Sequence, residues 1–352
     1  MRPSRAAHPM TRRKATLVAL LVALWPSAGA ARQRLAVLPF QALVRGQSAR
    51  AVVMPVVAAA LAAKGYEVVA GERVEQVLQA ERIRYLDSLL PDQVGSMLAL
   101  LGADAAVLGT VVEYVPGPDA AVALHIRVVS REGVLWSELV ALRASESAGA
   151  LGGGKARNGE ELVRIACKRA LESLPRDGKL ERVNRPYRPG HTPRVYRARE
   201  LLSRSIRICI LPVENLTSDP RATRVIATAL QDVLDRTRSV DVVQPAELRA
   251  ALVATGVRNL TDLTPEAAKA LSGALGTTLF LRGTILRYME STPELELYLS
   301  LTDLASGRVL WSGLSRREGA EYQTWTRSRG ERNHAMLAER VVAELIQAFT
   351  SG

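Results

Sequence analysis

Residues Gly102–Tyr114, GADAAVLGTVVEY, return in altered form as Gly276–Tyr288, GTTLFLRGTILRY. Both copies keep the two glycines, the Gly-Thr step and the final tyrosine, and the same inner positions are apolar in each. An apolar run bounded by glycines predicts a buried central strand. The chain therefore contains one structural unit twice.

The similarity between the two copies extends in both directions from the central strand. Upstream, Arg34–Leu43 (RLAVLPFQAL) resembles Arg207–Leu216 (RICILPVENL), and downstream the sequence VLWS occurs at both 134–137 and 309–312. A repeat this long indicates a duplicated domain, because solenoid repeats have about 20 to 50 residues. We expect the two VLWS tryptophans, Trp136 and Trp311, to share one packing role.

The predicted order of elements is strand, helix, strand, helices, three strands and a closing helix, and it occurs twice. The predicted fold class is α/β, with two tandem mixed-sheet α/β domains. Pro55 falls inside the first predicted helix (48–64) and indicates a kink or a later start near Met54. In the second copy we expect Asp219 to cap a helix that begins at Pro220.

The segment Ala121–Val129 alternates strictly between two kinds of side chain. One face carries Val122, Leu124, Ile126 and Val128, whereas the other includes His125 and Arg127. This alternation predicts a strand with one face on the core and the other in water.

Residues 1–30 have the three parts of a signal peptide. Basic residues 12–14 precede the apolar run 15–25, and the small residues 28–30 follow. The apolar run has about half of the ~20 residues that a membrane-spanning helix needs, so a membrane anchor is the weaker alternative. We expect a periplasmic protein that begins near Ala31, and the start at Met1 or Met10 stays open.

The mature chain divides into a first domain at 31–175, a linker at 176–203 and a second domain at 204–352. The formal net charge is +12, and basic residues are concentrated in and just before the linker. Because the charge is confined to one segment of an exported chain, no nucleic-acid partner is expected. We predict that proteases cut the linker first, leaving two independently folded domains, and that 195–202 forms a short helix.

The opening strands LAVLPF and ICILPV, the Gly-Thr central strand, the alternating strand and the VLWS strand together resemble the amino-terminal domain of TolB and its relatives. These relatives include the curli secretion lipoprotein CsgG and LpoB, an activator of peptidoglycan synthases. The resemblance implies the tandem α/β fold and an envelope function. The chain lacks TolB's propeller, the cysteine of a lipoprotein anchor and the pore-forming hairpins of CsgG.

No motif for catalysis or cofactor binding stands out. The segment Gly149–Lys155, GALGGGK, fits a phosphate-binding loop, but Ala156 stands where a magnesium-binding Ser or Thr belongs. The mature chain's histidines are scattered, without metal-ligand spacing, and no GxSxG elbow occurs. We therefore predict no catalytic residues, no metal and no cofactor. The two cysteines, Cys167 and Cys209, are expected to be buried free thiols, with an interdomain disulfide as the alternative.

The sequence thus predicts an exported, non-catalytic envelope protein, periplasmic or peripheral to the outer membrane. Its expected partner is an envelope protein or peptidoglycan, in envelope biogenesis, secretion or synthase regulation. The alternatives are a periplasmic hydrolase with an unrecognised site, or a module for a nucleotide or another anionic ligand. The basic linker is either a solvated spacer or, as a further candidate, a segment that binds an anionic envelope surface. The candidate partner-binding residues are Arg182, Arg185, Arg188, Arg194, Arg197, Arg199 and Trp325.

Overall fold

The computed structural model describes residues 32–43, 48–83, 86, 89–117, 119–146, 156, 158–176, 180, 190–198, 206–237, 239–258, 260, 263–289, 292–323 and 331–351. The predicted signal peptide lies outside these ranges. From Gln33 onward the chain forms one compact unit that contains both repeats. No helix among the described residues is long and apolar enough to cross a membrane.

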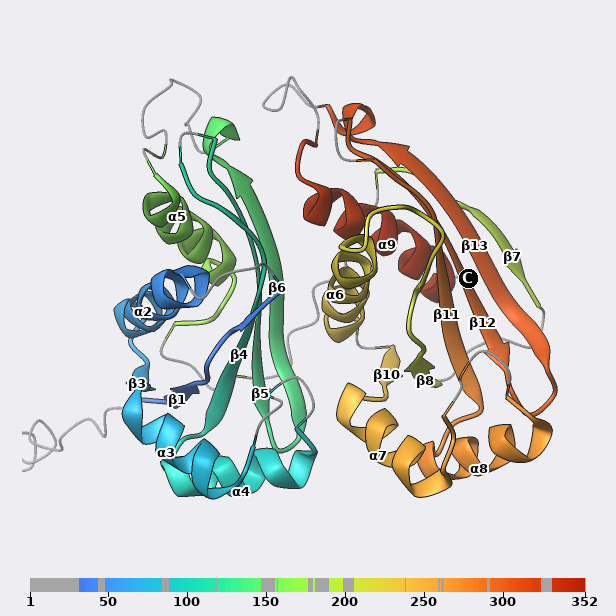
Figure 1. Cartoon of the computed structure of the whole chain (residues 1–352), viewed down its shortest axis with the longest axis horizontal. Coiled ribbons are helices and arrows are strands. Elements are labelled where there is room, and N and C mark those ends of the chain that lie inside the picture. The colour runs from blue at the N-terminus through green and yellow to red at the C-terminus, as the bar shows by residue number, and fades with distance from the viewer. Residues whose placement is uncertain are drawn as a thin grey trace, which may run out of the picture. The chain divides into compact units, whose positions relative to one another are not determined.

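The first repeat forms a mixed sheet of order β3-β1-β4-β5-β6, and β2 also pairs with β4 (Figure 1). In this sheet β3, β1 and β4 run parallel to one another, and the long strands β4, β5 and β6 form an antiparallel meander. The strands are β1 (Arg34–Val37), β2 (Gln41–Ala42), β3 (Glu67–Val69), β4 (Ala105–Val115), β5 (Ala121–Ser130) and β6 (Gly133–Arg143). The helices are α2 (Ser48–Ala63), α3 (Glu72–Ala80), α4 (Pro91–Leu101) and α5 (Gly159–Leu171), with a 3-10 turn η2 (Ala144–Glu146).

The second repeat forms a sheet of order β10-β8-β11-β12-β13-β7, with β9 paired to β11. Its strands are β7 (Arg194–Arg197), β8 (Ile206–Ile210), β9 (Glu214–Asn215), β10 (Val240–Val242), β11 (Leu279–Met289), β12 (Glu294–Asp303) and β13 (Arg308–Glu318). Its helices are α6 (Ala222–Asp235), α7 (Pro245–Thr255), α8 (Pro265–Leu275) and α9 (His334–Thr350), with a 3-10 turn η3 (Gly319–Tyr322). The predicted fold class, two tandem mixed α/β units, is confirmed.

The local predictions hold with three corrections. Helix α2 continues through Pro55 from Ser48, without a later start. Helix α6 begins at Ala222, two residues later than predicted, although the Asp219 carboxylate accepts a hydrogen bond from the Arg221 backbone N–H at 2.8 Å, as a capping side chain does. The helix predicted at 195–202 is wrong: Arg194–Arg197 is strand β7, which pairs antiparallel with β13 and extends the second sheet into the predicted linker.

The Gly-Thr step of each central strand has a packing cause. A Cβ atom added to Gly109 would lie 2.1 Å from the Phe40 ring, so the ring occupies the space of the missing side chain. In the second repeat, a Cβ on Gly283 would lie 3.3 Å from Val213 and 3.1 Å from Leu299. Phe40 and Val213 end the two matching segments LAVLPF and ICILPV, so each opening strand packs over the glycine of its own central strand.

Helices α2 and α5 cover the inner face of the first sheet, and α6 and α9 cover the inner face of the second (Figure 1). Helices α6 and α9 also contact β6 of the first sheet. One buried cluster joins Val112, Ala123, Leu139 and Ala141 of the first sheet to the core of the second repeat. Because the two repeats share this core, the prediction of independently folding domains is not supported.

The outer face of β5 was predicted to be in water, and this prediction is wrong. His125 and Arg127 are 4% and 8% exposed. Polar side chains from the second repeat cover them. Strand β5 is therefore buried on both faces, on one by the core of its own repeat and on the other by the second repeat. Trp136 and Trp311 are both buried, in line with the predicted shared packing role, and the prediction of two buried free cysteines, Cys167 and Cys209, is confirmed.

Candidate functional site

A buried polar cluster joins the outer face of β5 and β6 to helix α6. Ser137 donates a hydrogen bond to the Asp232 Oδ1 atom at 2.7 Å, and His125 Nε2 lies 3.0 Å from the Ser137 hydroxyl and 3.6 Å from the same carboxylate oxygen. Asp232 is fully buried. The carboxylate is therefore held by side chains from both repeats.

Arg236 carries the positive charge at the centre of this cluster. Its Nη2 atom contacts both Asp232 and Glu339 on α9, and its Nη1 atom lies 3.8 Å from Glu138 on β6. Ser173 in turn donates to Glu138 at 3.1 Å. One guanidinium thus connects a strand of the first repeat with both inner helices of the second.

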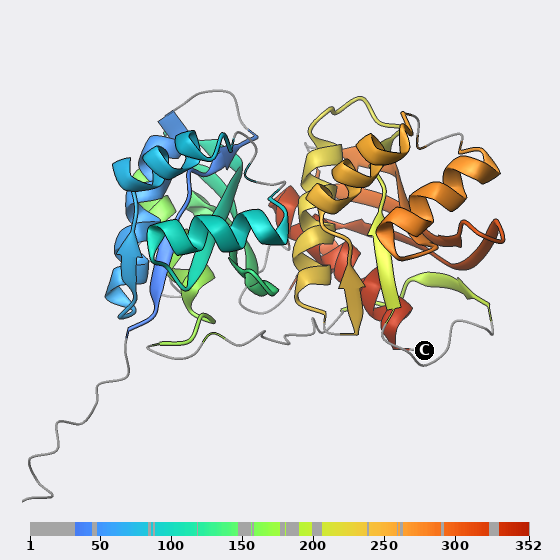
Figure 2. The same cartoon turned by 90° about the horizontal axis from the view of Figure 1, so that it is seen from below.

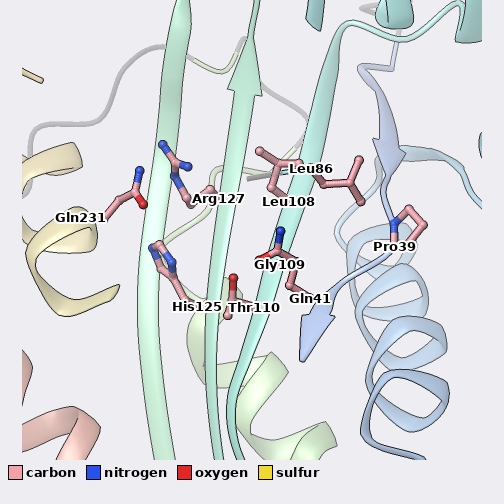
Figure 3. A pocket seen from close by; sticks show the side chains of 9 residues that line it. All are labelled: Pro39, Gln41, Leu86, Leu108, Gly109, Thr110, His125, Arg127 and Gln231. Carbon is pink, nitrogen blue, oxygen red and sulfur yellow. The ribbon is translucent and has the colours of Figure 1, made fainter. Parts of the chain in front are cut away.

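Arg127 makes a second junction beside the first. Its Nε atom lies 2.8 Å from Asp235, and its Nη2 atom donates to the Gln244 side chain at 3.0 Å. With its amide oxygen turned toward Arg127, Gln231 accepts from both terminal nitrogens at 3.2 Å. Figure 3 shows His125 and Arg127 side by side on their strand, facing Gln231. The cavity that these residues help to line measures only about 40 Å³.

Burial and mutual charge shift the pKa values in this cluster in opposite directions. Burial alone would raise the pKa of Asp232, but Arg236 and the contacts with His125 and Ser137 outweigh it and lower that pKa to about 2. Burial, opposed by Arg236 and assisted by the charge of Asp232, raises the pKa of Glu339 to about 7. Burial also raises the pKa of Asp235, against the effect of Arg127.

The cluster suits a structural role better than catalysis. Its carboxylates are paired and buried, and Asp232, Asp235 and Glu339 do not line the small cavity beside them. That cavity, about 40 Å³, is far below the range of about 300 to 1,000 Å³ typical of ligand sites. A perturbed carboxyl group in a deep pocket would have favoured the hydrolase alternative. Here the perturbed groups lie at a junction without room for a substrate.

A much larger cavity, of about 640 Å³, lies at the ends of the two central strands. This volume is within the range of about 300 to 1,000 Å³ that is typical of ligand sites. Its walls come from the end of β4, the end of β11 and the first turns of α6 and α9. They include Tyr114 and Tyr288, the final tyrosines of the repeated stretch, together with the apolar residues Leu43, Val112, Val115 and Val225.

The polar groups of this cavity are mostly basic. Arg224 on the first turn of α6 lines it, as does Arg221, which precedes that helix and pairs with Asp219 at 2.8 Å. His334 lies at the first turn of α9. Helix N-termini carry a partial positive charge, which adds to that of the arginines. Glu113 is the acidic member of the lining, and its carboxylate accepts a hydrogen bond from Asn333 at 3.1 Å. An anionic group with apolar neighbours is the complementary ligand.

The predicted partner-binding residues are not gathered at this cavity. Arg194 is exposed on β7, whereas Arg197 donates hydrogen bonds to the backbone oxygens of Ala348 and Phe349 at 2.7 and 2.6 Å, so it caps the end of α9. The others lie outside the described residues, as does the glycine-rich segment 149–155; they are Arg182, Arg185, Arg188, Arg199 and Trp325. Among the described residues, no group of three or more His, Cys, Asp or Glu could hold a metal ion.

Sequence reasoning missed the cavity, although one signal for it was present. Tyr114 and Tyr288 end the two copies of the repeated stretch, and an amphipathic aromatic side chain at the same strand end in both copies is consistent with a shared surface. Arg221 and Arg224 gave no comparable signal, because arginine is common throughout the chain.

No protein-family model matches the chain, and the comparison with curated proteins also gave no match. Among solved structures, a lipoprotein of Neisseria meningitidis matches at 20% identity over 41% of this chain and 97% of its own, with a TM-score of 0.31. The PelC dodecamer from Paraburkholderia phytofirmans matches at 17% identity, over 45% and 96% of the two chains, with a TM-score of 0.28. The C-terminal domain of LpoB from Salmonella enterica matches at 16% identity, over 34% and 86%, with a TM-score of 0.26. LpoB belongs to the predicted resemblance, whereas these matches do not support the tandem TolB assignment, and their TM-scores carry no inference about function.

Proposed function

We propose that this chain is an exported, non-catalytic binding protein of the bacterial envelope, and that its partner is an envelope protein or peptidoglycan. The observation that carries this proposal is the cavity of about 640 Å³ at the ends of β4 and β11. It has the size of a ligand site, aromatic and apolar walls, and basic groups at one side.

The chemistry of the cavity favours a partner segment that combines carboxylate and apolar groups. Arg224 supplies positive charge, beside Arg221, which is paired with Asp219. Tyr114 and Tyr288 supply amphipathic rings of the kind enriched at protein interfaces. Protein segments and the peptides of peptidoglycan both offer carboxylates beside small apolar side chains. Both partner classes therefore fit the same residues.

The placement of the cavity supports a rigid binding site. Its walls come from both repeats, and these are fixed to each other by the charged cluster around Arg236 and by the shared apolar core. Rigid sites lose less conformational freedom on binding, which favours affinity. On this proposal the polar cluster positions the cavity and performs no chemistry of its own.

The test is a binding experiment with the chain lacking residues 1–30. The wild-type protein and the double variant Arg221→Glu/Arg224→Glu are compared for co-sedimentation with purified sacculi and for capture of proteins from envelope extract. Arg258→Glu, an exposed charge reversal after α7, is the matched control. The proposal predicts that one of the two preparations yields a partner bound by wild type and control but lost in the double variant. Equal binding by all three proteins would contradict it.

A further inference from the structure

Helix α2 exposes an apolar surface that has no counterpart on the other inner helices. No charged residue occurs from Ala51 to Ala63, and Ala51, Pro55, Ala59 and Ala62 are exposed. A helix that is apolar on all sides is normally buried on all sides. In α5, the neighbouring helix, the exposed surface instead carries the ion pair of Glu160 and Arg164.

The matching helix of the second repeat shows what such a surface can contact. The buried series Ala49, Val53, Val57 and Leu61 of α2 corresponds to Ala222, Ile226, Leu230 and Leu234 of α6. In the same alignment of the two helices, Ala59 corresponds to Asp232 and Ala62 corresponds to Asp235. Those two aspartates face the outer side of the first sheet, so α2 exposes the surface that α6 uses to bind that sheet.

The outer face of the second sheet carries the positions that the first sheet uses at this junction; Tyr298 there is half-buried and Ser300 is 8% exposed. Tyr298 pairs with Thr284 as His125 pairs with Thr110, and Ser300 pairs with Arg282 as Arg127 pairs with Leu108. Tyr298 and Ser300 are therefore the counterparts of His125 and Arg127.

The two surfaces differ from the internal junction in a coordinated way. The internal junction places histidine and arginine on the sheet against two aspartates on the helix. At those positions the second sheet carries Tyr298 and Ser300, and the exposed helix carries two alanines. The helix therefore brings no charge into the contact, and the carboxylates that pair with His125 and Arg127 inside the chain have no counterpart on it.

We propose that a second copy of this chain docks its α2 onto the outer face of β12, β13 and β7, repeating the junction that α6 makes inside the chain. Figure 1 shows no helix of the described residues over this face, whereas α6 and α9 lie against the equivalent face of the first sheet. Tyr196 of β7 pairs with Ser312 and is 56% exposed, so it adds an aromatic side chain to the docking face.

The proposed contact joins two different surfaces, and it therefore propagates head to tail. Such a contact gives a ring when its rotation closes and a filament when it does not. An open assembly keeps one free α2 at one end and one free sheet face at the other until it closes. Blocking either surface alone therefore stops growth, and this gives the proposal its sharpest test.

The experiment uses three blocking variants of the chain lacking residues 1–30, one on the helix and two on the sheet. Ala59→Asp places a charge on α2, and Tyr298→Asp places one on the sheet; Tyr196→Asp is a second sheet variant at a more exposed position. Val253→Asp is the control, because Val253 is 80% exposed on α7, away from both surfaces. Sedimentation velocity over a range of concentrations measures the assembly, and circular dichroism verifies that each variant is folded.

We expect wild type and the control to associate as concentration rises, and each blocking variant alone to associate about 100-fold more weakly, since an unpaired charge must be desolvated. An equimolar mixture of Ala59→Asp with either sheet variant keeps one intact junction, so it should form a 1:1 dimer that does not grow. A monomeric wild type, unweakened variants or a mixture that stays monomeric would each overturn the proposal. Binding of α2 to lipid vesicles by a monomeric wild type would assign the surface to a membrane instead.

Discussion

Replacing Glu339 by glutamine should make the protein more stable above neutral pH and leave it nearly unchanged in acid. Glu339 is 3% exposed and shares the Arg236 guanidinium with Asp232. Burial of the carboxyl group, with the added charge of Asp232, raises the pKa of Glu339 to about 7 against the effect of Arg236. Glutamine imitates the protonated form and removes the charge.

The magnitude follows from the pKa of the folded and unfolded states. An unfolded glutamate titrates near 4.5, so between about pH 4.5 and about pH 7 the folded chain holds a proton at Glu339 that the unfolded chain has lost. Stability from this group is therefore complete below about pH 4.5 and is lost as the pH rises through about 7. The loss amounts to about 3 kcal/mol in the wild type and is absent in Glu339→Gln.

Urea unfolding at pH 5 and pH 8, followed by tryptophan fluorescence, measures this difference. Trp136 and Trp311 are buried, one in each repeat, so the fluorescence reports on both. We expect Glu339→Gln to exceed wild type by about 2 to 3 kcal/mol at pH 8 and to differ by less than about 1 kcal/mol at pH 5. Glu160→Gln on the exposed side of α5 is the control and should show no such pH-dependent gain. A Glu339→Gln variant destabilised equally at both pH values would refute the reasoning.

Three further predictions rest on other parts of the chain. Gly109→Ala should cost about 1 to 3 kcal/mol in urea unfolding, because its Cβ would meet the Phe40 ring at 2.1 Å, and Phe40→Leu should recover part of the loss; no recovery would mean that the strain lies elsewhere. Burial raises the pKa of both Cys167 and Cys209 to about 12, so neither thiol should react with a thiol reagent in the native protein, and fast native labelling would contradict their burial. Binding to anionic vesicles, if the basic segment provides it, should fall between 50 mM and 500 mM salt, since the Debye length shrinks from ~10 Å at 0.1 M to ~3 Å at 1 M. The same binding should fall when five of the six arginines are changed to serine: Arg182, Arg185, Arg188, Arg194 and Arg199. Arg197 is left unchanged because it caps α9. Binding that responds neither to salt nor to these substitutions would exclude the segment.

The sequence predicts the interior of each repeat well, because the information is local. The central strands 102–114 and 276–288 repeat one apolar pattern between glycines, and the helix ends at Gly102 and Gly276 need the left-handed conformation that both adopt, with φ of 61° and 65°. Periodicity and glycine placement depend on near neighbours in the chain. Two similar copies also test each other, so an element found in one repeat supports the same element in the other.

The junction between the repeats could not be predicted in the same way. His125 and Arg127 look like the wet side of a two-faced strand, and Asp232 and Asp235 look like the wet side of an amphipathic helix. These side chains are buried only because the strand face and the helix face pack against each other. That contact joins distant parts of the chain, and the local pattern of a single sequence does not predict it. The helix predicted at 195–202 failed for a related reason: four residues become a strand because β13 offers an edge, whatever their own preference.

The central claim is that the cavity at the ends of β4 and β11 binds an envelope partner, and site-specific photo-crosslinking tests it most directly. A photoreactive amino acid replaces Val115, which lines the cavity and is 44% exposed, or Val253 on α7, which is 80% exposed and lies away from it. Each full-length protein is produced in cells and irradiated, and its adducts are identified by mass spectrometry. We predict a defined adduct with an envelope protein or peptidoglycan from position 115 that position 253 does not give and that Arg221→Glu/Arg224→Glu abolishes. No adduct at 115, or the same adducts from both positions, would contradict the claim.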